Sequence, residues 1–136
     1  DNDTLRRVTR LVRWHDLRMP PREKSVRRAV NRIGEDIFPD YLEVRRADVL
    51  AQSQYLREEK LRDIEETEAI YHKIIEAGQC VSLKDLAVNG RDLLEAGVAP
   101  GKEIGEKLHE LLELVLEEPE LNTKEKLLAW LDSCMK

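Results

Sequence analysis

Apolar residues recur along most of the chain at steps of three and four, which places them on one side of an α-helix. A first run, over residues 4–17, is carried by Leu5, Val8, Leu11 and Val12. The "MPP" stretch at residues 19–21 ends it, because proline cannot continue a helix. A second run, over residues 22–34, is carried by Val26, Val30 and Ile33. The pattern therefore predicts two helices in the first quarter of the chain.

The segment from residue 41 to 77 contains neither proline nor glycine, and its apolar residues keep the helical spacing. This predicts one long helix with at most a slight break, which would span about 45–50 Å at 1.5 Å per residue. Gly78 is expected to close the helix. Before it, Pro39 in the "FPDY" stretch predicts a turn, because the residue that precedes a proline is disfavoured in helical geometry.

After Gly78 the predicted elements become short. A short helix is expected behind Ser82, followed by a turn at Asn89 and Gly90 and a second short helix up to Gly97. An amphipathic helix is predicted between Gly101 and Pro119, with one apolar face formed by Ile104, Leu108, Leu111, Leu112, Val115 and Leu116.

A last helix is predicted from Asn122, because Glu125 stands at the reciprocal capping position. With an aromatic content of only 4%, which argues against a sheet-rich protein, the fold class predicted is all-α.

The 136 residues can form one domain or two small ones. No stretch approaches the roughly 18 apolar residues of a membrane span, and the first residues lack a signal-peptide core, so we expect a cytoplasmic protein without a membrane partner. Cys80 and Cys134 are the only cysteines, which supports neither a disulfide framework nor a zinc site.

The net charge of −5 hides an uneven distribution. Glutamates dominate residues 106–120, whereas the first quarter carries a basic block formed by Arg6, Arg7, Arg10, Arg13, Arg18, Arg22, Lys24, Arg27, Arg28 and Arg32. Such a block can neutralise phosphates even on an acidic protein. A solvated helix face is an equally good interpretation.

The stretch "EAGVAPGKEIG", residues 95–105, has the composition of an anion site. A helix that begins at Gly101 would present its free amides and positive end to a phosphate beside Lys102. The arrangement resembles the hairpin of helix-hairpin-helix modules, which grip phosphates without reading bases. Alternatively, the glycines only cap two short helices.

The stretch "RRADVLAQ", residues 45–52, places Asp48 among small and apolar neighbours. Asp48 could be a metal ligand, which would need histidines and another aspartate, or a surface carboxylate paired with Arg45 or Gln52. His15 and Asp16 are the nearby candidates, but adjacent residues on a helix point in different directions, so they do not form a site alone. No Ser/His/Asp, Cys/His or P-loop arrangement is present, and catalysis by this chain alone is not expected.

Residues 45–71 together with residues 80–122 resemble the C-terminal part of bacterial CCA-adding tRNA nucleotidyltransferases that carry an HD domain. The resemblance covers about residues 12–128 and rests most on an ordered set: Lys84, Asp85, Leu86, Asn89, Gly90, Asp92, Leu93, Gly97, Pro100, Gly101, Gly105 and Leu108. In that family a head domain adds CMP and AMP to the tRNA 3′ end, and helical neck, body and tail segments follow. The head is absent from this sequence.

The resemblance implies three parts: HD-like or body helices over residues 1–48, a connecting helix over 49–77, and a tRNA-binding tail over 78–136. It implies tRNA as the partner, held at its elbow through the RNA backbone by Lys84, Asn89, Gly90, Arg91, Gly97, Pro100, Gly101 and Lys102. It also implies that Asp48 is the last aspartate of an HD metal set, with His15 and Asp16 near that site.

This chain alone is expected to need no cofactor, while the parent enzyme is expected to use Mg2+ with CTP/ATP and to hold a divalent metal where the HD site is functional. Two alternatives stay open. The chain could be part of an HD-type metal-dependent phosphohydrolase, or it could be a helical protein-interaction module that forms a homodimer through the apolar face of residues 101–118.

Overall fold

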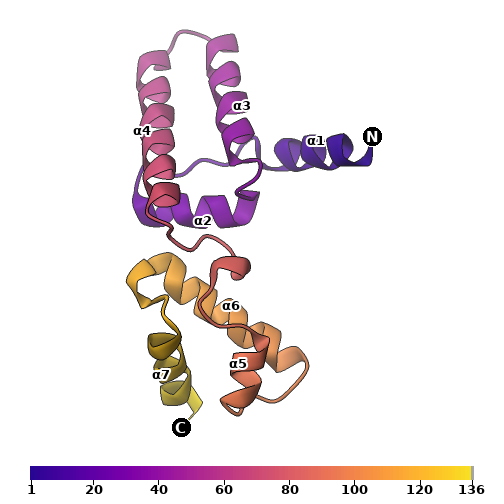
Figure 1. Ribbon diagram of the computed structural model, residues 1–136. Helices are drawn as coiled ribbons and strands as arrows, with labels where there is room; N and C mark the ends of the chain where they lie inside the picture. Colours follow the sequence, from indigo (N-terminus) through magenta and orange to yellow (C-terminus); the bar gives the residue numbers. More distant parts are fainter. Residues whose placement is uncertain (136) are drawn as a thin grey trace. The chain divides into compact units, whose positions relative to one another are not determined.

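A computed structural model of the protein describes residues 1–135, and this range contains seven α-helices, two short 3-10 helices and no strand (Figure 1). The predicted all-α class is therefore confirmed. The chain divides into an N-terminal unit, Asp1–Gly78, and a C-terminal unit that begins at Gln79. Among the described residues, no helix combines the length and the apolar character that crossing a membrane requires.

The N-terminal unit consists of α1 (Asn2–Trp14), α2 (Glu23–Ile33), α3 (Phe38–Ala51) and α4 (Arg57–Glu76). The first two helices lie where the apolar spacing predicts them. Helices α3 and α4 run antiparallel, and α2 lies across one end of this pair (Figure 1). The buried core contains Val26, Ala29, Val30, Ile33, Ile37, Phe38, Tyr41, Leu42, Val49, Ile64, Tyr71 and Ile74.

The prediction of one long helix over residues 41–77 is wrong, because the chain reverses between α3 and α4. Gln52 is extended, and Leu56 adopts a left-handed conformation with φ of 56°. The Arg57 guanidinium donates to the carbonyl oxygens of Leu50 and Gln52 at 3.2 and 2.9 Å, which satisfies the end of α3. Reversal lets the apolar faces of both helices bury one another, which a single extended helix could not do.

The turn predicted at "FPDY" is also wrong, because these residues begin α3. Pro39 lies in the first turn of the helix. The amide groups of a first turn have no acceptor within the helix, so the missing N–H of proline costs nothing there.

Helix α1 has no buried residue, and two of its arginines pair with other parts of the N-terminal unit. Arg7 pairs with Asp40 at 2.5 Å, and Arg10 donates to the Ile33 carbonyl and to Asp36 at 2.9 Å. The hydrogen bond from Arg10 lowers the pKa of Asp36. Part of the basic block therefore pairs within the chain and is not a free phosphate-binding surface.

The C-terminal unit consists of η1 (Leu83–Asp85), α5 (Gly90–Glu95), α6 (Lys102–Glu117), η2 (Pro119–Leu121) and α7 (Lys124–Met135). Its core contains Cys80, Leu86, Val88, Leu93, Val98, Leu111, Leu112, Val115, Leu116, Leu127 and Leu131. The apolar face of α6 is thus buried inside its own unit. It is not available as the dimerisation surface that the sequence left open.

Two capping predictions need correction. Asn89 and Gly90 do not form a separate turn, because the Asn89 side chain accepts from the Asp92 amide and caps α5. Helix α7 is capped by Thr123 rather than by Asn122, since the Thr123 hydroxyl accepts from the Lys126 amide at 3.2 Å.

The Asn122 side chain instead joins two distant segments. It accepts from the Ala87 amide at 2.8 Å and donates to the Asp85 carbonyl at 3.0 Å. These bonds hold the residues that follow η1 beside the C-terminal end of α6, which ends at Glu117. Periodicity cannot reveal such a role because the partners lie more than 30 residues away along the chain.

We expect Asn122→Ala to lower the free energy of unfolding of the C-terminal unit by about 1–2 kcal/mol, because both bonds are lost and their backbone partners return to water. Urea unfolding followed by circular dichroism measures this change. Asn2→Ala, at an exposed position on α1, serves as the matched control and should leave the transition unchanged. Equal midpoints for the two variants would show that the bridge contributes no net stability.

Candidate nucleic-acid interface

The end of α5 forms a complete Schellman motif. The Gly97 amide donates to the Leu94 carbonyl at 3.1 Å, and the Val98 amide donates to the Leu93 carbonyl at 3.0 Å. Gly97 has φ of 99°, a conformation in which an L side chain is strained, and Val98 is buried in the core. The structure therefore gives Gly97 a capping role, which was the alternative to phosphate contact.

The start of α6 has the features of an anion site. Gly101 is its N-cap with φ of 96° and supplies no side-chain hydrogen bond, so the first amides keep no side-chain partner there. A Cβ built on Gly101 would meet nothing within 4 Å, which leaves the approach open. The Lys102 side chain is 90% exposed and lies 3.8 Å from Glu106. A phosphate could reach both the helix end and the ammonium group.

The structure places Arg91 near this helix end but separates Lys84 from it. A Cβ built on Gly90 would lie 3.2 Å from Ile104 Cγ2, so α5 begins against the first turn of α6 and brings Arg91 there. Lys84 belongs to η1, beside the residues that Asn122 holds at the other end of α6. The 16 residues of α6 separate these ends by about 24 Å.

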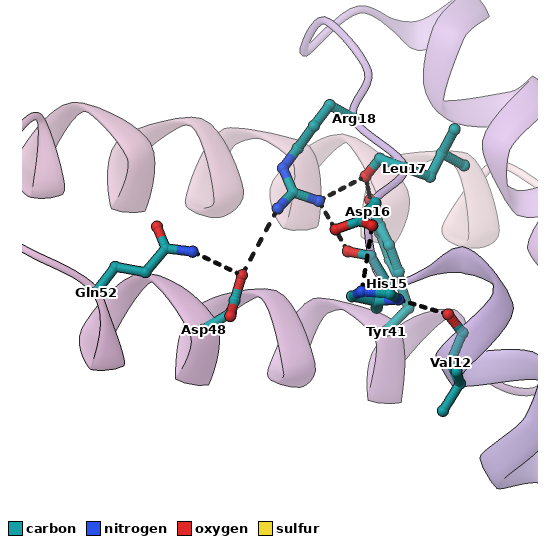
Figure 2. A network of polar contacts seen from close by, with 8 residues as sticks. All are labelled: Val12, His15, Asp16, Leu17, Arg18, Tyr41, Asp48 and Gln52. Carbon is teal, nitrogen blue, oxygen red and sulfur yellow. Dashed lines mark hydrogen bonds and ion pairs between the residues drawn. The ribbon is translucent and has the colours of Figure 1, made fainter.

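A second group of polar residues surrounds Asp48 (Figure 2). The Asp48 carboxylate accepts from Gln52 Nε2 at 3.1 Å and lies 3.9 Å from Arg18 Nη2. Arg18 Nη1 also donates to the carbonyl oxygens of His15 and Leu17 at 2.9 and 3.0 Å. Figure 2 shows the Arg18 guanidinium between Asp48 and the residues that follow α1.

His15 and Asp16 do face one another, contrary to the argument from helix geometry. His15 Nε2 lies 3.2 Å from Asp16 Oδ2, and His15 Nδ1 contacts the Val12 carbonyl oxygen. The argument fails because α1 ends at Trp14, so the two residues lie in the turn behind it.

The donor set around Asp48 does not fit a metal ion. Within residues 1–135, no three His, Cys, Asp or Glu side chains come close enough together to hold one. The positive charge beside Asp48 is a guanidinium, and its other neighbour is an amide that donates a hydrogen bond. The remaining HD ligands that the resemblance requires would have to come from outside this sequence.

Comparison with known proteins supplies the observation that decides the family. Residues 1–131 match the family described as tRNA nucleotidyltransferase domain 2. The chain belongs to this family. No curated protein and no solved structure matches it.

The two units of this tRNA nucleotidyltransferase domain differ in charge. Residues 79–136 contain seven Lys and Arg against twelve Asp and Glu, whereas residues 1–78 contain sixteen of each. The C-terminal unit is therefore acidic, and any anion site in it depends on local groups such as the start of α6 rather than on its net charge.

The sequence of this tRNA nucleotidyltransferase domain did not point to two further residues of α3, which lie one and two turns before Asp48. Tyr41 is fully buried, and its hydroxyl donates to the Leu17 carbonyl oxygen. Arg45 is 7% exposed, and its Nε and Nη1 atoms are buried without a hydrogen-bond partner. Burial raises the pKa of Tyr41 and lowers that of Arg45. The signal that could have found Arg45 is its place at helical spacing between Leu42 and Val49, whereas Arg46 lies outside this buried stripe.

Proposed function

We propose that this chain is the tRNA-holding C-terminal part of a bacterial CCA-adding tRNA nucleotidyltransferase. It positions the tRNA so that a nucleotidyltransferase head, using Mg2+ with CTP/ATP, adds CMP and AMP to the 3′ end. The family match supports the link to tRNA. The open, uncapped start of α6 at Gly101 and Lys102 is the observation that favours a backbone contact.

The proposed contact reads RNA shape and phosphates rather than bases. Backbone amides and a lysine recognise phosphate oxygens, which are the same for every sequence, as a protein that serves all tRNAs requires. The contribution to the reaction is proximity, because a bound tRNA presents its 3′ end at a fixed place. Arg91 adds charge at the same end of α6, while Lys84 would contact a different part of the RNA.

The proposal does not extend to an HD phosphohydrolase. Asp48 pairs with the Arg18 guanidinium and accepts from the Gln52 amide nitrogen, and neither of these nitrogen groups can bind a metal ion. It does not extend to a homodimer either, because the apolar face of α6 belongs to the core of its own unit.

We expect Lys102→Glu to weaken binding of tRNA that lacks its 3′ CCA by about tenfold, and to reduce the salt dependence by about one phosphate contact. Fluorescence anisotropy of labelled tRNA at several salt concentrations measures both quantities. Lys102 is a better test than Gly101, because φ of 96° at Gly101 would strain any side chain and confuse binding with stability.

Lys126→Glu provides the control, because it changes the net charge equally at an exposed position near η2, the far end of α6. Its affinity for tRNA should stay within about twofold of the unmodified protein, since long-range charge effects are screened by salt. Equal losses for Lys102→Glu and Lys126→Glu would show that net charge alone governs binding. Unchanged affinity for Lys102→Glu would remove the start of α6 from the interface.

A further inference from the structure

Tyr41, Arg45 and Asp48 follow one another on α3 at steps of four and three residues, and Gln52, the residue that ends the helix, comes four residues later. Side chains at these spacings are neighbours on a helix surface. The residues that follow α1 approach this face, since Arg18 lies beside Asp48 and the Tyr41 hydroxyl bonds to Leu17. Figure 2 shows this arrangement for Tyr41, Asp48 and Gln52.

Arg45 is the anomaly of this face. It is 93% buried, yet two nitrogens of its guanidinium have no hydrogen-bond partner. The stacking of its guanidinium 5.9 Å from the centre of the Tyr41 ring offsets only part of the lost hydration. Its guanidinium also interacts with the Tyr41 hydroxyl, but Nε and Nη1 stay without an acceptor. A buried charged group that is only partly hydrogen-bonded destabilises a fold, so these two nitrogens call for a partner that the protein alone does not supply.

The carboxylates nearby do not satisfy Arg45. Asp48 accepts from Gln52 and lies beside Arg18, and Asp63 on α4 acts on Arg45 only through its charge. Arg18 is itself unusual, because its side chain is 47% exposed and its hydrogen bonds go to backbone carbonyls. The carbonyl oxygen of Leu17 accepts from both Arg18 and Tyr41, which brings these two donors together. Arg45 lies near both, because its guanidinium is over the Tyr41 ring and because, besides burial, the positive charge of Arg18 lowers the pKa of Arg45.

We propose that Arg18 and Arg45 form a binding site for a phosphate group, carried either by a polynucleotide backbone or by a small phosphorylated molecule. A guanidinium presents parallel N–H groups that match two oxygens of a phosphate. Arg18, which is half exposed, turns toward the incoming anion, and the anion supplies the acceptors that Arg45 lacks. Asp48, which also accepts from Gln52, holds Arg18 in place until then.

The first test is the melting temperature in inorganic phosphate compared with chloride at equal ionic strength. Phosphate should raise the melting temperature of the N-terminal unit by about 5 °C, since a ligand that binds only the folded state stabilises it. Arg45→Met keeps the length and packing of the side chain but removes the donors, and Arg18→Gln removes the exposed guanidinium. Both variants should lose most of this shift.

Arg32→Gln, at an exposed position on α2, is the matched control and should keep the full shift. Phosphate stabilises many proteins without binding a site. The decisive quantity is therefore the difference between the phosphate-induced shifts in melting temperature of the variants and of the unmodified protein. A shift of the same size in Arg45→Met and Arg18→Gln, or no shift in the unmodified protein, overturns the proposal. Because Arg18 is half exposed, Arg18→Gln remains informative if Arg45→Met fails to fold.

Two further measurements, tRNA binding and the melting temperature in CMP, identify the molecule that carries the phosphate. If Arg18→Gln also weakens tRNA binding, and inorganic phosphate competes with tRNA only when Arg18 is present, the ligand is an RNA phosphate. If tRNA affinity is unchanged while CMP gives the same Arg18-dependent shift as phosphate, the ligand is a small phosphorylated molecule. Stabilisation by Mn2+ that Asp48→Ala abolishes, without any phosphate effect, would establish a metal centre and overturn the proposal. None of these results depends on Lys102, so a failure of this proposal can be told apart from a failure of the tRNA contact proposed at the start of α6.

Discussion

Replacing Phe38 by alanine is expected to lower the free energy of unfolding of the N-terminal unit by about 3–5 kcal/mol. Phe38 is fully buried, and its ring centre lies 5.4 Å from that of Tyr41 and 4.9 Å from that of Tyr71. The side chain thus joins the start of α3 to α4. Its loss removes the transfer free energy of an aromatic ring and leaves a cavity that two large rings cannot fill by small shifts.

Such a loss approaches the whole stability of a unit of this size, since small domains are stable by only about 5–15 kcal/mol. Urea unfolding at low temperature, followed by circular dichroism, should show an early transition for Phe38→Ala. Tyr55→Ala is the control, because it also truncates an aromatic ring but at a position that is 73% exposed. If both variants unfolded at the same urea concentration, the contacts of Phe38 with Tyr41 and Tyr71 would not be what stabilises the packing of α3 against α4.

The helices that the sequence predicted well are those whose pattern is complete within one element. Helices α1, α2 and α6 each show a continuous apolar stripe, and Pro119 stops α6 where expected. The reversal between α3 and α4 escaped prediction because residues 52–56 contain no glycine or proline. There the break follows from burial: two half-helices packed together bury more apolar surface than one extended helix.

The candidate sites show the same limit. The spacing of Gly97 and Gly101 correctly indicated a helix end followed by a helix start. It could not show that Lys84 and Lys102 lie at opposite ends of α6, which depends on the bridge made by Asn122. The spacing of Leu42, Arg45 and Val49 places Arg45 on the buried side of α3, but it could not show that the charged end is buried too, because an arginine stem can pack on apolar surface while its guanidinium reaches water.

Leu93→Ala is expected to weaken the proposed tRNA contact indirectly, because it destabilises α5. Helix α5 has only six residues, and Leu93 is the one that it buries. Leu93 also supplies the carbonyl that accepts from Val98, so the same residue anchors the helix and shapes its end. Truncation should cost about 2–5 kcal/mol in the unfolding of the C-terminal unit, because the void lies between α5 and α6.

Leu94→Ala provides a matched control on the same helix, since it makes the same chemical change at a position that is 48% exposed. Urea unfolding should separate the two variants, and amide hydrogen exchange should show loss of protection in α5 only for Leu93→Ala. Affinity for tRNA should fall about tenfold for Leu93→Ala under conditions where α6 stays folded, and stay unchanged for Leu94→Ala. If tRNA affinity survives the loss of α5, then α5 and Arg91 play no part in the contact. Lys102 and the start of α6 would then have to hold the phosphate alone.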